Sequence, residues 1–120
     1  VHNIRLITPT TDKKRLRKIL KFTSGFLYYV SITGITGTKK PSVLEVKKAV
    51  SRIKANTNLP VVVGFGIDNY KQAAALNKIS DGCVIGSAII KIIESYKEYS
   101  KSKISKKIED FLIKFSKDNK

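Results

Sequence analysis

The sequence contains one cysteine, one histidine and no tryptophan or methionine in its 120 residues. The single cysteine, Cys83, excludes an internal disulfide, which fits a reducing cytosol. No apolar run approaches the roughly 18 residues that a membrane-spanning helix needs. The charged N-terminal residues 1–5 are not followed by the apolar core of an export signal. These absences favour a cytoplasmic protein of one small domain.

The absence of methionine includes the initiator, because the chain begins with Val1. Two explanations remain open: the chain is a fragment of a longer protein, or an initiator methionine has been removed. Neither explanation argues against a folded core. Hydrophobic residues make up 42% of the chain, which is too many for wholesale disorder.

Acidic residues are scarce, since nine Asp and Glu stand against 24 Lys and Arg and the formal net charge is +15. Such an excess suits nucleic-acid binding, because Lys and Arg neutralise phosphates. The lysines, however, recur on every expected helix and alternate there with apolar residues, as in residues 13–20. We interpret them as a solvated surface that also attracts a small anionic substrate, and a basic nucleic-acid-binding protein is the alternative.

Four β-rich runs alternate with helical patterns along the chain. We expect strands near residues 4–8, 26–31, 61–64 and 82–85. Apolar residues at helical spacing separate these runs, and they include Leu16, Ile19, Leu20, Val43, Val46, Val50, Ile53, Ala73, Leu76, Ile104, Ile108, Phe111 and Phe115. Strand–helix alternation predicts a parallel sheet with right-handed crossovers. The continuous apolar run 61–63 predicts a strand that is buried on both faces.

The number of βα units indicates an α/β half-barrel. Four units in 120 residues amount to half of a TIM (β/α)8 barrel, whose full form needs about 250 residues. A flavodoxin-like open sheet is the rival, but it usually has a fifth strand. Four strands alone would leave two bare edges, which favour association. We therefore expect residues 1–120 to form one partial domain: the C-terminal half of a barrel, with four parallel strands and outer helices.

Glycine-rich turns follow the last three expected strands, at residues 34–37, 64–66 and 86–87. Glycine lets backbone N–H groups approach an oxygen-rich ligand without a Cβ in the way. A helix N-terminus adds unpaired donors and partial positive charge, which suit a phosphate. In (β/α)8 enzymes the loops after strands seven and eight often form this grip. The three turns together therefore predict phosphate binding.

We expect the remaining polar residues to have structural rather than catalytic roles. Thr10 or Thr11 is placed to cap the first helix, and Asp68 or Asn69 to cap the third. Cys83 lies in an apolar strand as a small core residue, and Ser87 has no histidine near it that could activate it as a nucleophile. The residues expected to serve only as a turn residue, a terminal residue or surface charges are Asp81, His2, Glu94, Glu98, Glu109 and Asp110. No metal-ligand spacing is present.

Four segments, in order, resemble the tryptophan synthase α subunit family. Residues 26–37, FLYYVSITGITG, resemble its sixth strand and loop. Residues 59–67, LPVVVGFGI, resemble its seventh strand and phosphate turn, and residues 81–89, DGCVIGSAI, its eighth strand and the short helix that follows. Residues 6–11, LITPTT, resemble the end of its fifth strand. The resemblance runs from about residue 4 to residue 96 and includes the Gly-Ile-Thr-Gly loop, which other phosphate-binding barrels lack.

The resemblance implies particular roles for residues of this chain. The family cleaves indole-3-glycerol phosphate to indole and glyceraldehyde 3-phosphate in tryptophan biosynthesis. The backbone amides expected around the substrate phosphate are those of Gly37, Gly66, Gly86 and Ser87. Tyr28 and Phe65 are expected to line the indole pocket, and Thr36 is expected to help close the mobile loop over the site.

The family's two acid–base carboxylates, a glutamate and an aspartate, come from the first half of the barrel. No residue of this chain matches either of them, so the resemblance implies an enzyme family but an inactive isolated chain. A non-catalytic phosphate-binding half-barrel is therefore a second alternative, beside the basic nucleic-acid-binding protein. It also implies a β subunit as the partner of the full-length protein, in an α2β2 complex. No cofactor is expected in this chain, because pyridoxal phosphate belongs to the β subunit.

Overall fold

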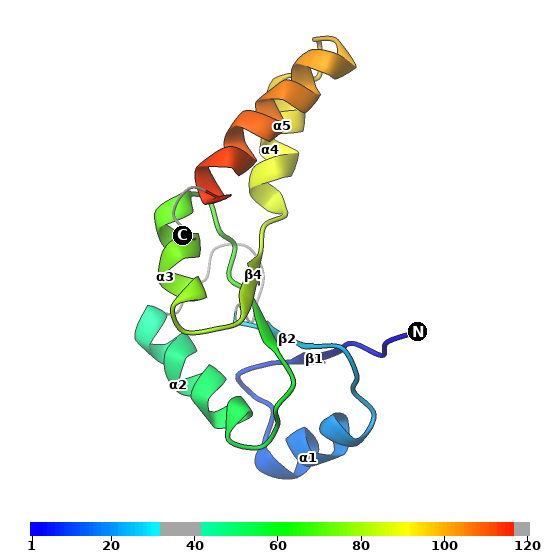
Figure 1. Cartoon of the computed structure of the whole chain (residues 1–120), viewed down its shortest axis with the longest axis vertical. Helices are drawn as coiled ribbons and strands as arrows, with labels where there is room; N and C mark the ends of the chain where they lie inside the picture. Colours follow the sequence, from blue (N-terminus) through cyan, green and yellow to red (C-terminus); the bar gives the residue numbers. More distant parts are fainter. Residues whose placement is uncertain (32–41, 117–120) are drawn as a thin grey trace.

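The computed structural model describes residues 1–31 and 42–116 (Figure 1). Four strands lie in these ranges: β1 (Arg5–Ile7), β2 (Leu27–Val30), β3 (Val61–Gly64) and β4 (Gly82–Val84). The helices there are α1 (Lys13–Lys21), α2 (Val43–Lys54), α3 (Tyr70–Asn77), α4 (Ser87–Ser95) and α5 (Lys101–Ser116). All four expected strands are therefore present, each within the predicted run.

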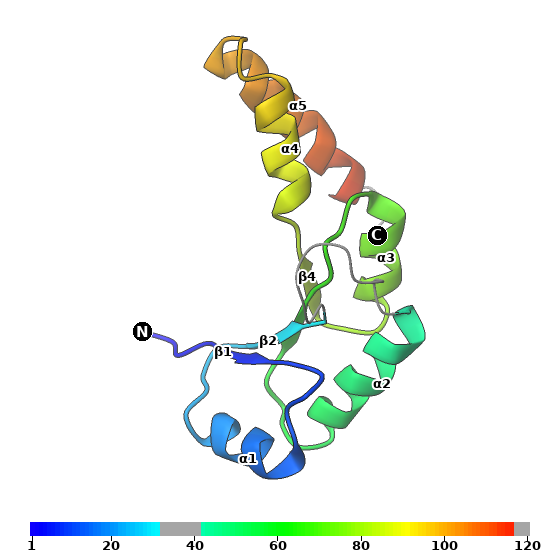
Figure 2. The ribbon, with the colours of Figure 1, turned by 180° about the vertical axis from the view of Figure 1, so that it is seen from behind.

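The strands form one parallel sheet in the order β1-β2-β3-β4. Ile7 pairs with Tyr29, Tyr29 with Val63, and Val63 with Cys83, so the strands are in step across the sheet. Consecutive strands are neighbours, as the half-barrel predicts, and β1 and β4 are the edges of this sheet. Helices α1, α2 and α3 lie on one side of it (Figures 1 and 2).

The cap of α1 differs from the prediction. Asp12, and not Thr10 or Thr11, is the N-cap, and its side chain accepts a hydrogen bond of 2.7 Å from the Arg15 amide. The hydroxyl of Thr11 is instead buried and accepts from the Thr8 amide at 3.1 Å. Asp12 therefore satisfies the helix end, while Thr11 stabilises the turn before it.

The other two caps follow the pattern that helix N-termini require. Ser42 and Glu45 form a capping box at the start of α2, in which each side chain accepts from the other residue's amide. Of the two predicted candidates at α3, Asn69 is the cap, because its side chain accepts from the Gln72 amide at 3.1 Å. Asp68 lies one residue before the cap, which leaves its carboxylate available for another contact.

The core lies between the sheet and these helices. Ile7, Leu27, Tyr29, Val61 and Val63 point from the strands toward the helices and are buried. The helices contribute the predicted stripes, which include Leu16, Val46, Val50, Ile53, Ala73 and Leu76. Burial of this apolar face is the dominant stabilising term for such a layered fold.

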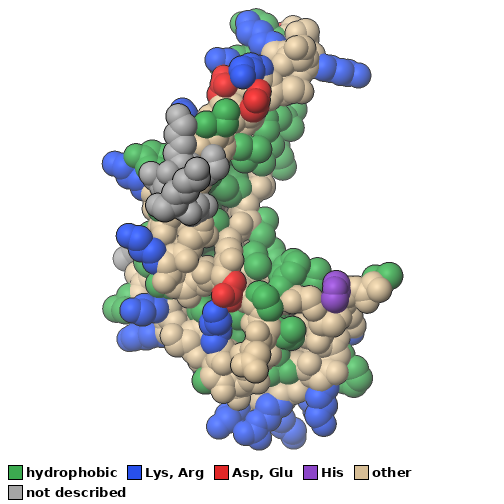
Figure 3. Space-filling view, viewed as in Figure 1, with side chains coloured by type: hydrophobic (Ala, Val, Ile, Leu, Met, Phe, Trp, Pro, Cys, Tyr) green, Lys and Arg blue, Asp and Glu red, His purple; other side chains and the backbone are tan. Residues whose placement is uncertain are grey.

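The opposite face of the sheet is more exposed than the sequence predicts. Leu6 and Val84 are 61% and 38% exposed, and Val62 is only half-buried, so β3 is not buried on both faces. In a closed barrel this face would point inward, where further strands would cover it. Figure 3 shows hydrophobic side chains gathered on the hollowed side of the molecule, whereas Lys and Arg lie mainly over α1 and the outer helices.

Helices α4 and α5 form an antiparallel hairpin that projects from the sheet (Figures 1 and 2). The ammonium of Lys103 lies 3.6 Å from the centroid of the Tyr99 ring at its tip. On α5, Lys106 pairs with Glu109 and Asp110 at 3.0 and 3.6 Å, so both acids are surface charges as expected. Among the residues described, no helix is long and apolar enough to cross a membrane.

Asp81 ties the N-terminal ends of β3 and β4 to α2. Its carboxylate accepts from the Val61 amide and from the Lys54 ammonium, both at 2.8 Å. The Lys54 hydrogen bond, and then the Val61 amide, hold the pKa of Asp81 below its usual range. Asp81 therefore serves the turn, as predicted, from the end of the strands remote from the glycine turns.

Replacing Asp81 by Asn should lower the free energy of unfolding by about 0.5–1 kcal/mol at neutral pH. The amide can still accept from Val61, but the charge of the Lys54 pair is lost, and the carboxylate's 38% exposure limits its contribution. Because the folded pKa is lowered, this stability is present above the unfolded pKa of about 3.9 and disappears as the pH falls through the folded value. Urea unfolding of both proteins at several pH values measures this, and a difference that grows in acid would contradict it.

Candidate phosphate site

The C-terminal ends of β2, β3 and β4 meet at one edge of the sheet. Val30 pairs with Gly64, and Gly64 with Val84, so the three strands end level with one another. Gly66 and Gly86 each lie two residues beyond these paired positions. The register therefore brings the second and third glycine turns side by side at the C-terminal end of the strands, where ligands of parallel sheets bind.

Gly66 has a backbone conformation that favours glycine. Its φ angle is +64°, in the left-handed region, and Gly25 is the other described residue with a positive φ. A β-branched residue is a genuine outlier at such an angle. The turn after β3 therefore requires Gly66 for its path, and this conformation also keeps the backbone bare of a side chain at the edge of the sheet.

The third turn opens directly into α4. Gly86 is the N-cap, no side chain caps the helix, and Ser87 is its first residue. A Cβ built on Gly86 would meet no heavy atom within 4 Å, so the space beside it is open. The first amides of a helix have no partner within the helix and carry its partial positive charge. The predicted residues Gly86 and Ser87 thus have the backbone setting that a phosphate prefers.

Tyr28 lies on the exposed face of the sheet, close to Gly64. A Cβ built on Gly64 would lie 2.5 Å from the Tyr28 hydroxyl and 2.9 Å from its ring. Only glycine at position 64 therefore lets the Tyr28 ring lie across β3 in this position. No sequence pattern beyond the glycine itself indicates this contact, because the contact depends on the register of β2 and β3.

Phe65, the second residue expected in the indole pocket, is 6% exposed and belongs to the buried core. Ser31 fixes the strand ends beside it: its amide and its hydroxyl both donate to the Gly64 carbonyl, at 3.0 and 2.7 Å. This polar contact was not predicted, since Ser31 resembles an ordinary strand residue in sequence. Thr36 and Gly37 lie outside the described residues.

An ion pair joins the second and third turns. The ammonium of Lys91 on α4 lies 3.4 Å from a carboxylate oxygen of Asp68, two residues after Gly66. This pair was missed by sequence reasoning, which considered Asp68 only as a helix cap. A lysine one helical turn after Ser87 is the signal that could have indicated it.

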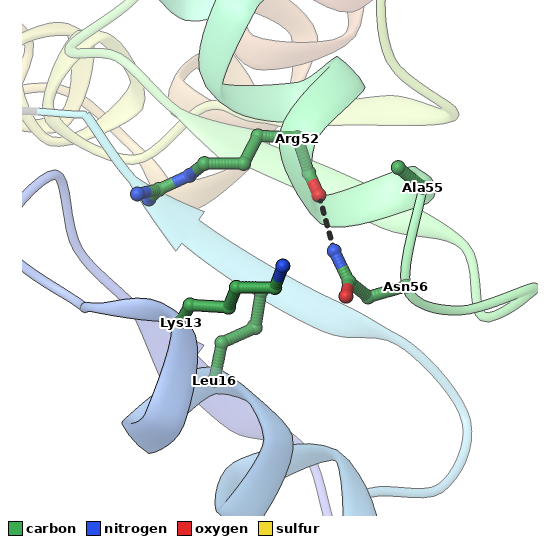
Figure 4. A pocket seen from close by; sticks show the side chains of 5 residues that line it. All are labelled: Lys13, Leu16, Arg52, Ala55 and Asn56. Carbon is green, nitrogen blue, oxygen red and sulfur yellow. Dashed lines mark hydrogen bonds between the residues drawn. The ribbon is translucent and has the colours of Figure 1, made fainter.

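A separate hollow of about 340 Å³ lies between α1 and α2 (Figure 4). Lys13 and Leu16 reach into it from α1, and Arg52, Ala55 and Asn56 line it from the end of α2 (Figure 4). The Asn56 amide donates to the Arg52 carbonyl at 2.8 Å. None of these residues was predicted for the phosphate site. Because Lys13 and Arg52 line the hollow, it is a second cationic feature, distinct from the glycine turns.

In the described part of the chain, the cysteine and the histidine are not placed as a nucleophile or as metal ligands. Burial raises the pKa of the Cys83 thiol, which disfavours the thiolate that a nucleophile needs. His2 is exposed beside Gly25, at the start of the chain. No group of three or more His, Cys, Asp or Glu side chains in residues 1–31 and 42–116 is placed to hold a metal ion.

Comparison with known proteins agrees with half of a TIM barrel. The model of the tryptophan synthase alpha chain family matches residues 1–118. The alpha chain from Novosphingobium aromaticivorans is 50% identical over 90 residues, which cover 75% of this chain and 34% of that protein. The chain therefore belongs to the tryptophan synthase alpha chain family.

Solved structures of the family share the fold. Subunit alpha from Legionella pneumophila superposes with a TM-score of 0.69 at 34% identity, over 82% of this chain and 35% of that one. A Mycobacterium tuberculosis tryptophan synthase gives a TM-score of 0.70 at 30% identity, over 79% and 36%. The matched part of the chain thus spans about a third of the length of these relatives.

Proposed function

We propose that this chain supplies the phosphate and indole walls of a tryptophan synthase α active site. In the complete barrel the reaction is cleavage of indole-3-glycerol phosphate to indole and glyceraldehyde 3-phosphate, a lyase reaction of tryptophan biosynthesis. The proposal rests on membership of the family. One structural observation carries it: two glycine turns lie level at the C-terminal end of the sheet, and one of them opens a helix.

The phosphate role belongs to backbone groups. The amides of Gly66, Gly86 and Ser87 would donate to the phosphate oxygens, with Gly37 from the loop after β2. Two observations support this: the positive φ of Gly66 favours a residue without a side chain, and the space beside Gly86 is open to an anion. The partial positive charge at the N-terminus of α4 adds to the attraction.

The indole role belongs to flat apolar surface. Tyr28 would present its ring from the exposed face of the sheet, across Gly64. Phe65 would contribute from the end of β3, where its side chain is buried in the core, and Thr36 would act in closing the loop over the substrate. Closure of such a loop excludes water and completes the arrangement of catalytic groups.

Proton transfer would require groups from elsewhere. Asp68 lies in the turn proposed to hold the phosphate, and Asp81 lies at the opposite end of the strands. Neither occupies a family catalytic position, so this chain binds substrate and the rest of a complete barrel supplies the acid and the base. The β subunit, with its pyridoxal phosphate, would be the partner of that complete protein.

The chain should bind glycerol 3-phosphate and should not bind glycerol, because the phosphate supplies the charge and acceptors that the turns match. Calorimetric titration of both compounds into the full 120-residue chain measures this. Mixed-sequence duplex DNA is the control for the alternative function. Submicromolar, strongly salt-dependent DNA binding, with no response to glycerol 3-phosphate, would replace the proposed function by a nucleic-acid role.

A further inference from the structure

The ion pair between Lys91 and Asp68 spans the two turns of the candidate phosphate site. Asp68 follows Gly66 by two residues, and Lys91 follows Ser87 by four, one turn further along the same face of α4. Side chains of a helix lean toward its N-terminus. The Lys91 ammonium, 3.4 Å from Asp68, is therefore directed back toward the end of α4 at which the Ser87 amide lies.

This pair is poorly suited to a structural role. The side chains of Lys91 and Asp68 are 69% and 44% exposed, and exposed ion pairs of this kind contribute little to stability. Asp81 and Lys54, by contrast, combine their ion pair with a hydrogen bond to a strand amide. The Lys91 ammonium can thus leave Asp68 at little cost when a stronger anion is present.

We infer that Lys91 is a further ligand of the substrate phosphate, held beside the site by Asp68 until the phosphate binds. This inference rests on the proposed phosphate site. On binding, the ammonium exchanges the single charge of the carboxylate for the doubly charged phosphate, and its hydrogen bond becomes one to a phosphate oxygen. Asp68 then opposes the bound anion, because it is a like charge at the same edge of the sheet.

The two residues therefore have opposite effects on affinity. Lys91→Met should weaken binding of glycerol 3-phosphate about tenfold, since a charge-assisted hydrogen bond is lost. Asp68→Asn should tighten binding about threefold at low salt, since a repelling charge is removed. Lys91→Arg should retain most of the affinity because it keeps the cation. A pair that merely fastened the two turns together would weaken binding in both the Lys91→Met and the Asp68→Asn variants.

Calorimetry of the full chain with glycerol 3-phosphate and with inorganic phosphate tests this, with thermal melting of each variant to verify its fold. Lys13→Met is the matched control: it removes the same charge from the hollow between α1 and α2, and affinity should stay within about twofold. Unchanged affinity in Lys91→Met, or weaker binding in Asp68→Asn, would overturn the inference and leave the proposed function intact. Loss of affinity in Lys13→Met alone would place the anion in that hollow and overturn it too. Failure of the wild-type chain to bind either anion would overturn both.

Discussion

The Gly66→Val variant should bind glycerol 3-phosphate at least about tenfold more weakly than the wild-type chain. Valine at a φ of +64° is strained, and the left-handed region costs an L-residue about 1–2 kcal/mol. The turn relieves that strain by moving, and its amides then no longer face the anion. The added side chain also occupies space at the edge of the sheet where the proposed phosphate lies. Calorimetric titration of the two proteins measures the difference.

Gly25 provides a matched control for backbone strain. Its φ is +84°, and it lies before β2, at the end of the sheet remote from the glycine turns. A Cβ there would lie 3.1 Å from the His2 side chain, which is exposed and free to shift. Gly25→Val should therefore lose thermal stability to a similar extent as Gly66→Val and keep wild-type affinity. Equal affinity in wild type and Gly66→Val would remove Gly66 from the site.

Gly86→Val is a second variant that distinguishes loss of phosphate binding from loss of stability. Gly86 has a negative φ, and a Cβ built there meets nothing within 4 Å, so the fold should accept the substitution. Weaker phosphate binding in this stable variant would show that the open space beside α4 is where the anion lies. The two variants together therefore test both turns of the site.

The architecture could be predicted from sequence because its signals are local. Each strand is a short β-rich run bounded by turn residues. Of the predicted stripe on α2, Val46, Val50 and Ile53 are buried, whereas Val43 at the start of the helix is 39% exposed. Alternating strands and helices leave few topologies, since parallel crossovers are right-handed and usually join neighbours. Strand direction followed from these rules, and the order of the strands followed from the half-barrel that the family resemblance implied.

The features that sequence missed depend on contacts between distant segments. The run 61–63 is apolar throughout, yet Val62 is half-buried, because nothing in the pattern says whether a second layer covers that face. The contact of Tyr28 with Gly64 depends on strand register. The pair of Asp68 and Lys91 depends on how α4 leaves the sheet. Composition and spacing indicate that the turns suit a phosphate, but they do not indicate which side chains accompany them.

The isolated chain should release no indole above background from indole-3-glycerol phosphate, even at high protein concentration. Cleavage of this carbon–carbon bond needs a base to take a proton and an acid to protonate the indole ring. Positioned groups of this kind contribute about 10²–10⁴-fold each. Asp68 belongs to the turn proposed for the phosphate and matches no family catalytic position, and Asp81 is held by Lys54 and Val61 at the opposite end of the strands. We therefore expect the chain to bind the substrate at its phosphate and to leave the bond intact.

Adding the first half of a related α chain, as a separate polypeptide, should restore part of the activity. That half would bring the missing carboxylates, and it would dock on the edges of β1 and β4 and cover the face that carries Leu6 and Val84. Thr36→Ala should then lower the restored turnover more than the binding of glycerol 3-phosphate, because loop closure acts on the reacting groups rather than on the phosphate. A colorimetric indole assay of the mixture measures this, and the first half assayed by itself is the control. Substantial indole production by the 120 residues without any addition would contradict this account, because it would require an acid–base pair within this chain.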